Sequence, residues 1–381
     1  MGKLIRAADL FCGGGGTSSG LYQACRQLGA TVDLVAVNHW AVAIQTHKAN
    51  HPDARHICAS LDSIDPRVAV PEGHLNILVA SPECTYHSVA RGGKPINDQL
   101  RASAWQVLRW MELLNIDNAI IENVAEFSLW GPLNKKGRPI KSRQGEIYQS
   151  FLTALRALNY NVEDRVLTAA DYGDPTSRRR LFIQARRGRK KIVWPDATHT
   201  ESQTDELKPY RTARDVIDWS MPGESIFKRK KPLAPATLAR IAAGLRKYGG
   251  KNAEPFLVML YGSNDAGSVD RPMPTITANG EMALVEPFLT MYYGQSTASS
   301  INEPLDTITT RDRFGLVEPC VDGETVYDIR FRMLQPHELA AAMSFDADYQ
   351  FAGNKTDKVK QIGNAVPVQT ATALCKAILN S

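Results

Sequence analysis

Short apolar runs alternate with amphipathic segments over the first 190 residues. The apolar runs typical of buried strands are residues 4–11, 32–37, 75–80, 118–121, 162–169 and 181–185. Between them, the apolar spacing of helices is found in residues 21–28, 41–49, 100–114 and 145–158. Strands that alternate with helices predict βαβ units and a parallel sheet covered on both faces. We therefore expect an α/β fold with a Rossmann-like, doubly wound sheet.

The pattern changes at about residue 190, where Pro, Gly, Thr and Ser become frequent and one clear helix, residues 235–248, remains. Residues 254–262 recur as residues 286–294, a period of 32 residues (286 − 254), and a third Glu-Pro at 318 continues it. Each unit contains two short strand candidates separated by turns. A chain of 381 residues is long enough for two domains. We predict a first part of the main domain (1–190), a smaller β-rich domain with the repeat (191–325) and a C-terminal completion of the main domain (326–381).

Charge matters here through its position more than through its sum of +5. Basic residues cluster at 178–191 and at 228–231. Such clusters suit a polyanion, because neutralised phosphates supply most non-specific nucleic-acid affinity. A solvated basic face is the alternative for either cluster. The six cysteines show no CxxC pair and no zinc spacing, which predicts a cytoplasmic protein without a metal. No signal peptide or membrane span is expected.

Cys84 is the first candidate for chemistry. It follows the apolar run 75–80 and opens a polar loop that carries Ser88 and Arg91. Ligands of open α/β sheets bind beyond the carboxyl ends of strands, so a cysteine at this position predicts a nucleophile. The alternative is a small buried hydrophobe, the usual role of a free cysteine. Glu122 leaves the next strand, so its side chain should point into the same crevice.

A glycine-rich turn, residues 12–20, links the first strand to the first helix. Four consecutive glycines let the backbone approach a ligand and leave helix N–H groups pointing at it. Taken alone, the turn is compatible with any nucleotide-type cofactor or with a tight turn. The second strand leads into His39, where dinucleotide folds normally place an acid for the ribose hydroxyls. Trp40 is placed to cover an adenine face, and Leu61 and Asp62 to meet the adenine edge.

Six motifs in order resemble the DNA cytosine-5 methyltransferase family. They are Asp9-Leu10-Phe11-x-Gly13-x-Gly15, Pro82-x-Cys84, Glu122-Asn123-Val124, Arg178-x-Arg180, Arg332-x-Leu334-x-x-x-Glu338 and Gly363-Asn364-Ala365-Val366-Pro367. The match covers roughly residues 5–185 and 328–380. The resemblance implies a class I methyltransferase fold in which residues 191–325 are an inserted target-recognition domain.

The resemblance also implies a reaction on double-stranded DNA with S-adenosylmethionine as donor and S-adenosylhomocysteine as product. The target cytosine is flipped out, because its ring cannot be reached inside the stack. The Cys84 thiolate then adds to C6 and makes C5 nucleophilic, while protonated Glu122 stabilises the charge at N3. Arg178 and Arg180 hold the flipped base, and Ser88 holds a phosphate. Flipping one base requires only a monomer.

Cofactor and DNA contacts follow from the same resemblance. Phe11 is expected against the adenine, with the glycine loop beneath the cofactor and Asn364 to Val366 closing over it. The expected cofactor residues are Asp9, Phe11, Gly13, Gly15, His39, Trp40, Leu61, Asp62, Pro82, Asn364, Ala365 and Val366. The expected DNA contacts are Ser88, Arg91 and Arg101. A prokaryotic or phage-infected cell is the expected setting.

Three positions depart from the family pattern. Glu83 replaces a proline beside the nucleophile, and an anion there raises a thiol pKa unless Glu83 points away or pairs with a cation such as Arg180. His39 replaces the ribose acid, and Thr176 replaces a glutamine. The alternatives are a carboxylated S-adenosylmethionine as donor, a tRNA cytosine as substrate, a catalytically silent DNA-binding protein and a nicotinamide oxidoreductase. Retention of the whole catalytic set argues against the silent protein.

Overall fold

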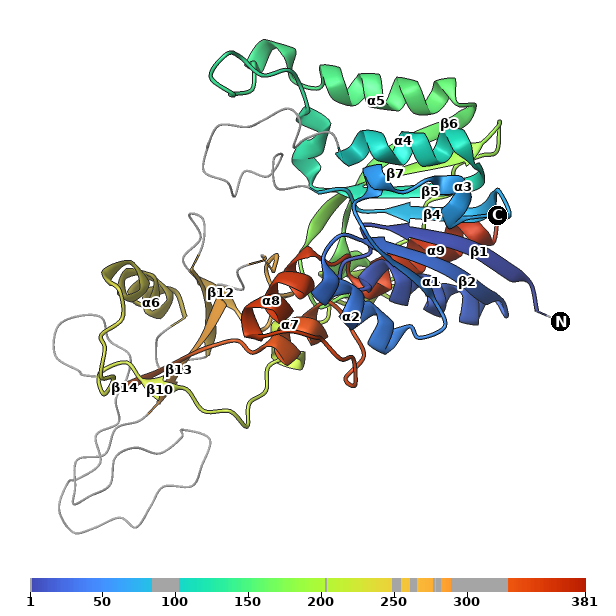
Figure 1. Cartoon of the computed structure of the whole chain (residues 1–381). Coiled ribbons are helices and arrows are strands. Elements are labelled where there is room, and N and C mark those ends of the chain that lie inside the picture. The colour runs from blue at the N-terminus through green and yellow to red at the C-terminus, as the bar shows by residue number, and fades with distance from the viewer. Residues whose placement is uncertain are drawn as a thin grey trace, which may run out of the picture.

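A seven-stranded sheet forms the larger part of the computed structural model (Figure 1), which describes residues 2–83, 103–202, 204–248, 255–260, 266–276, 278, 282–288 and 328–381. The strand order is β3-β2-β1-β4-β5-β7-β6; β7 is antiparallel to both of its neighbours, β5 and β6, and the other pairings are parallel. The strands are β1 (Leu4–Leu10), β2 (Thr31–Asn38), β3 (Arg55–Cys58), β4 (His74–Ala80), β5 (Asn115–Asn123), β6 (Tyr160–Thr168) and β7 (Arg179–Arg187). The predicted α/β fold with a doubly wound sheet is confirmed.

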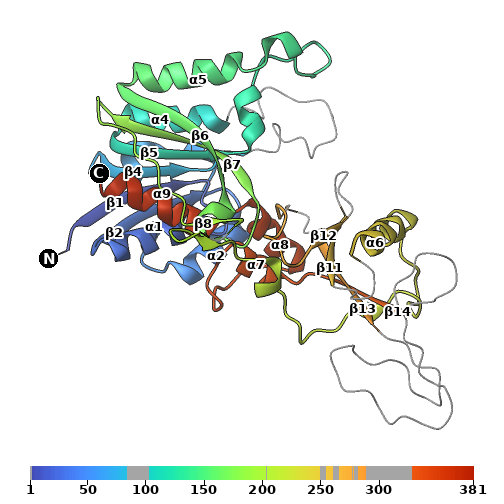
Figure 2. The same ribbon diagram turned by 180° about the vertical axis from the view of Figure 1, so that it is seen from behind.

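Helices cover both faces of this sheet (Figures 1 and 2). On one face, α1 (Gly16–Gln27) and α9 (Val368–Leu379) share an apolar core with β1. On the other face lie α3 (Pro66–Ala69), α4 (Ser103–Leu113) and α5 (Glu146–Ala157). The sequence of α5 explains its packing, because its buried residues recur at helical spacing. They are Tyr148, Phe151, Leu152 and Leu155. The remaining helix of this part is α2 (Ala41–Asn50).

A second, five-stranded antiparallel sheet lies beside the first, in the order β10-β14-β13-β11-β12. Its elements are β10 (Glu224–Ser225), β11 (Phe256–Met259), β12 (Ala266–Ser268), β13 (Met282–Phe288), β14 (Asp328–Met333) and the helix α6 (Pro235–Tyr248). Helices α7 (Pro336–Ala342) and α8 (Lys355–Asn364) follow β14, and the short strands β8 (His199–Thr200) and β9 (Lys208–Pro209) form a separate pair.

Successive side chains of β11 pack on opposite faces of this small sheet. Phe256 and Val258 pack in one cluster with Ile241 of α6, whereas Leu257 and Met259 pack in another that includes residues of α7 and α8. A strand buried on both faces is expected to divide its side chains in this way. The C-terminal strand β14 therefore pairs into the small sheet, and the chain returns to the large sheet only with α9.

Most of the second repeat, residues 289–294, and the third Glu-Pro at 318 lie outside the described residues, so the repeat stays a prediction. Within the described part of the chain, no helix has both the length and the apolar character needed to cross a lipid bilayer.

Candidate active site

The carboxyl ends of β1, β2 and β4 lie side by side and are tied together by the backbone. The N–H of Cys12 donates to the carbonyl of Val37 at 3.0 Å, and the N–H of Ser81 donates to the carbonyl of Leu10 at 3.1 Å. Segments that are far apart in the sequence therefore meet at the carboxyl edge of the sheet, where open α/β sheets bind ligands.

The glycine loop after β1 has the backbone that its sequence requires. Phe11, Gly13 and Gly15 have φ of +63°, +51° and +93°, in the left-handed region. This is unusual for a bulky residue such as Phe11 and normal for glycine. A Cβ added at Gly13 would find no atom of its surroundings closer than the Phe11 carbonyl at 3.8 Å, so the space above Gly13 is open to a ligand.

The C-terminal segment meets this loop. A Cβ at Gly16 would overlap the carbonyl oxygen of Val366, and a Cβ at Gly14 would lie 3.3 Å from the Gln361 Cβ. Ala365 and Val366 are buried, whereas Asn364 is exposed. Two motifs separated by about 350 residues are thus brought together, as the resemblance implies.

Asp9 lies beneath the loop instead of facing the crevice, with 1% of its surface exposed. Ser18 Oγ donates to Asp9 Oδ2 at 2.6 Å. His47 Nε2 lies 2.9 Å from Ser18 Oγ, and His47 Nδ1 lies 2.9 Å from His56 Nε2. Since the Ser18 proton goes to Asp9, Ser18 accepts from His47 Nε2–H, and His47 Nδ1 accepts from His56 Nε2–H. Asp9, expected as a cofactor contact, supports the loop through this chain of hydrogen bonds.

Burial shifts the pKa values of this group. It raises the pKa of Asp9 to about 7, against the lowering effect of hydrogen bonds from Ser18. It lowers the pKa of His47 well below the ordinary value, and that of His51 to about 4, with nearby histidines adding to both effects. The side-chain rings of Tyr22 and His51 are stacked with centroids 5.0 Å apart.

Sequence reasoning missed these histidines. The available signal was the i, i+4 spacing of His47 and His51, which places both on one face of a helix. Within the part of the chain that the structure describes, no group of three His, Cys, Asp or Glu side chains is arranged to hold a metal ion.

Glu122 and Arg180 form an ion pair near the carboxyl end of β5. Glu122 is the penultimate residue of β5, with 7% of its surface exposed, and its Oε1 lies 3.2 Å from Arg180 Nε. It lines a small cavity together with Ser81, Phe182 and Val366. The arginine that the sequence offered as a partner for Glu83 is therefore paired with Glu122.

Arg178 is buried instead of facing the crevice, with 3% of its surface exposed. Its Nη1 donates to the carbonyl of Ile276 at 3.1 Å and to that of Gly363 at 3.0 Å. Thr176 Oγ1 donates to the Pro274 carbonyl at 3.4 Å. Arg178 was expected to hold the flipped base; here its guanidinium joins the loop between β12 and β13 to the segment that precedes Asn364.

The residues expected around the adenine and ribose lie at the ends of β2, β3 and β4. Trp40 has Lys360 Nζ 4.5 Å from its ring centroid. Leu61 is buried and Asp62 exposed. Pro82 is buried and accepts a hydrogen bond at its carbonyl from Asn123 Nδ2 at 3.1 Å.

Two of the three substituted positions, His39 and Glu83, meet. His39 Nδ1 lies 3.9 Å from Glu83 Oε1. Glu83 is therefore directed toward the end of β2 instead of toward Arg180. Cys84, Ser88, Arg91 and Arg101 lie outside the described residues, so their roles stay predictions.

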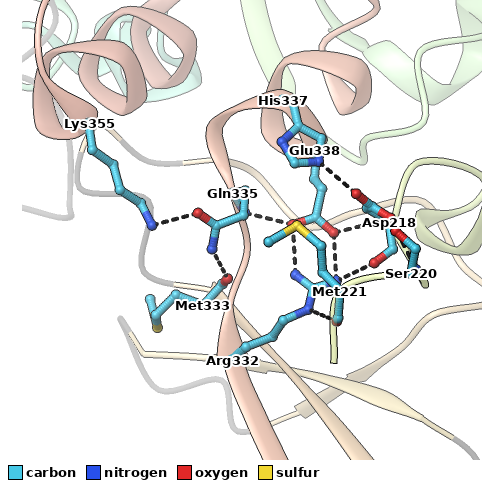
Figure 3. A network of polar contacts seen from close by, with 9 residues as sticks. All are labelled: Asp218, Ser220, Met221, Arg332, Met333, Gln335, His337, Glu338 and Lys355. Carbon is cyan, nitrogen blue, oxygen red and sulfur yellow. Dashed lines mark hydrogen bonds and ion pairs between the residues drawn. The ribbon is translucent and has the colours of Figure 1, made fainter. Parts of the chain in front are cut away.

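A buried ion pair between Arg332 of β14 and Glu338 of α7 joins the small sheet to this helix (Figure 3). Arg332 Nη1 and Nη2 donate to the two carboxylate oxygens of Glu338 at 2.8 and 2.9 Å. Glu338 also accepts from the backbone N–H groups of Asp218 at 2.8 Å and Gln335 at 2.6 Å. Arg332 Nε donates to the Met221 carbonyl at 2.8 Å. The Arg-x-Leu-x-x-x-Glu motif therefore fixes β14, α7 and the 218–221 segment to one another.

Strand order, a single antiparallel strand and a glycine loop at the switch point define a class I methyltransferase fold. Solved structures agree: a mutant of DNMT2 from Spodoptera frugiperda has a TM-score of 0.59 at 18% identity, with 99% of this chain and 100% of that chain covered. The Entamoeba histolytica methyltransferase EhMeth has a TM-score of 0.59 at 15% identity, with 99% and 98% covered.

The chain belongs to the C-5 cytosine-specific DNA methylase family, whose model matches residues 5–380. The type II methyltransferase M.SacI of Streptomyces achromogenes is 23% identical over 415 residues, which cover all of this chain and 94% of that protein. M1.HphI of Haemophilus parahaemolyticus is 24% identical, with 97% and 86% covered. M.AgeI of Thalassovita gelatinovora is 27% identical over 60% of this chain, and the match spans about half (54%) of that protein's length.

Proposed function

We propose that this chain transfers the methyl group of S-adenosylmethionine to C5 of a flipped-out cytosine in double-stranded DNA. The observation that carries the proposal is the buried pair of Glu122 and Arg180 near the carboxyl end of β5. A cytosine ring needs a hydrogen-bond donor at N3 when its C6 is attacked; Glu122 supplies it in its protonated form, and Arg180 fixes the position of the carboxyl group. The family match supports the same reaction.

The glycine loop suits the donor. Gly13 and Gly15 adopt left-handed backbone, the space above Gly13 is open, and Ala365 and Val366 pack against the loop from the C-terminal side. When bound, S-adenosylmethionine supplies an electrophilic methyl group on a sulfonium. The chain's own residues then hold its adenine, through Phe11 and Trp40, and exclude water from the transfer.

Two side chains, Cys84 and Glu122, act on the base in the proposed steps. The Cys84 thiolate forms a bond to C6 while Glu122, in its protonated form, donates to N3, so that C5 becomes enamine-like. Arg180 holds Glu122 in place throughout. After C5 has gained the methyl group, a base removes the C5 proton and the Cys84–C6 bond breaks, which restores the thiolate.

We propose the same division of labour that the sequence predicted, with residues 1–190 and 326–381 for catalysis and 191–325 for target recognition. The strand β14 and the Arg332–Glu338 pair join the two parts. We further propose that the chain acts as a monomer and without a metal, and that it modifies DNA within a restriction–modification system.

Nucleoside mass spectrometry on duplex DNA incubated with the protein and S-adenosylmethionine tests this function. We expect 5-methylcytosine from the wild type, none from Cys84→Ser, and an unchanged yield from Cys58→Ser, a matched change at an exposed cysteine. A Cys84→Ser variant that still methylates would overturn the adduct mechanism. Two further incubations test the alternatives. The carboxylated donor would give carboxymethylcytosine, which differs in mass from 5-methylcytosine, and a tRNA substrate would give methylated cytosine in RNA.

A further inference from the structure

The second strand of the large sheet ends without the acid that dinucleotide folds place there. β2 ends at Asn38, and His39 and Trp40 follow. Asn38 Oδ1 accepts the Trp40 backbone N–H at 2.8 Å, so this side chain is engaged in the turn. A ribose presents two hydroxyl donors, and burying them without an acceptor costs binding free energy. If the donor binds here, another side chain must supply the acceptor.

The acids on or next to β1, β3 and β5 are placed for other tasks. Asp9 is buried beneath the glycine loop. Glu122 is paired with Arg180 on the side of β5 and β7. Asp62 follows β3, at the outer edge of the sheet. Glu83, which follows β4, reaches instead toward the end of β2, across the intervening strand β1.

The geometry of the His39–Glu83 contact leaves the carboxylate available to a ligand. The distance from His39 Nδ1 to Glu83 Oε1 is 3.9 Å, too long for a hydrogen bond, so the oxygens keep their acceptor sites. The two side chains are 57% and 46% exposed. An ion pair this exposed contributes little to stability, and both side chains remain accessible to a ligand.

We propose that Glu83, oriented by His39, is the carboxylate that accepts hydrogen bonds from the ribose hydroxyls of the donor. The inference rests on the proposed function, because it assumes that the donor is an adenosine derivative. Trp40, the expected adenine contact, adjoins His39 in the chain. The two departures from the family pattern, at positions 39 and 83, then compensate for each other, and the Glu83 charge is directed toward His39.

The test is a binding cycle between Glu83 and one hydroxyl of the ligand. Calorimetry measures the affinity of S-adenosylhomocysteine and of its 2′-deoxyribose analogue for the wild type and for Glu83→Gln. We expect the analogue to bind the wild type about tenfold more weakly or worse, because hydrogen bonds to charged groups are strong. We expect Glu83→Gln to lose a similar factor for S-adenosylhomocysteine and to distinguish the two ligands by less than about threefold.

Asp62→Asn is the matched control, since Asp62 is also an exposed acid at a strand end. Whatever its own effect on affinity, it should keep the full wild-type preference for the 2′-hydroxyl. A second variant tests the substitution itself: adding His39→Glu to Glu83→Gln places the acid at the end of β2, and we expect the 2′-hydroxyl preference to return.

Two results would overturn the inference. One is a Glu83→Gln variant that keeps the wild-type preference for the 2′-hydroxyl. The other is a wild type that binds S-adenosylhomocysteine and its deoxy analogue equally. A wild type that binds neither ligand would overturn the proposed function instead, so the two failures are distinguishable.

Discussion

Two buried polar networks support the two parts of this molecule, and they are built on different principles. The Arg332–Glu338 network at the small sheet pairs opposite charges, and each carboxylate oxygen accepts two hydrogen bonds (Figure 3). In the Asp9–Ser18–His47 chain beneath the glycine loop, no cation among the described residues faces the carboxylate, which accepts from the neutral Ser18 hydroxyl. Burial shifts the pKa values of the second network strongly. The first network therefore depends on keeping its partner, and the second on its protonation state.

Removing one partner of the charged network should have the largest effect. Glu338 has none of its surface exposed, so Glu338→Ala leaves the Arg332 guanidinium buried without its counterion. Breaking a buried pair in this way costs about 3–5 kcal/mol of unfolding free energy. Urea unfolding followed by circular dichroism measures the change. Glu146→Gln, which disrupts the exposed Arg143–Glu146 pair, is the control and should leave the midpoint unchanged. Equal midpoints for the two variants would mean that the buried pair does not stabilise the fold.

Acidification should have the next largest effect on the free energy of unfolding, through the histidines near the glycine loop. The pKa of His51 falls from 6.5 to about 4 on folding, so between these values the unfolded chain binds a proton that the native state does not. The native state therefore loses stability as the pH falls from 6.5 toward 4, by about 3 kcal/mol for this group. Replacing His51 by Gln removes that contribution, and unfolding measured at pH 7 and pH 5 should show a smaller difference than in the wild type.

Asp9 should act in the opposite direction. Its pKa rises from 3.8 to about 7 on folding, so the native state holds a proton that the unfolded chain has lost. Its contribution therefore falls as the pH rises from 4 to 7. In Asp9→Asn, the loss of stability on acidification should be steeper than in the wild type. If His51→Gln and Asp9→Asn changed the slope in the same direction, the assignment of these two groups would be wrong.

The sequence predicted those parts of the molecule that depend on local pattern. The period of α5 and the glycine loop follow from residues close together in the chain. The ordered motifs predicted that Gly13 to Gly16 and Asn364 to Val366 would meet. The strand β14 was not among the predicted elements; its residues Ile329 and Phe331 pack in one cluster with Ile241 of α6.

What the sequence could not predict depends on contacts between distant segments. Arg178 has the expected motif, yet its direction is set by the carbonyls of Ile276 and Gly363, each more than 90 residues away. The meeting of His39 and Glu83 likewise requires β2 and β4 to flank β1. Neither residue pattern contains that information, so motif residues predicted the region of the site better than the direction of each side chain.

The smallest expected effect comes from the Asp9–Ser18–His47 chain, because removing its hydroxyl does not take the counterion from a buried charge. Ser18→Ala takes away the donor to Asp9 Oδ2 and the acceptor for His47, at a cost of about 1–2 kcal/mol. The sharper readout is the Asp9 pKa, because the Ser18 hydroxyl lowers it and its loss should raise it above about 7. Carbon-13 NMR of the aspartate carboxyl groups measures that titration. Ser19→Ala, which removes a neighbouring hydroxyl bonded to His51, should leave the Asp9 titration where it is in the wild type. An equal shift in both variants would mean that helix α1 as a whole, and not the Ser18 hydroxyl, sets the protonation of Asp9 beneath the loop.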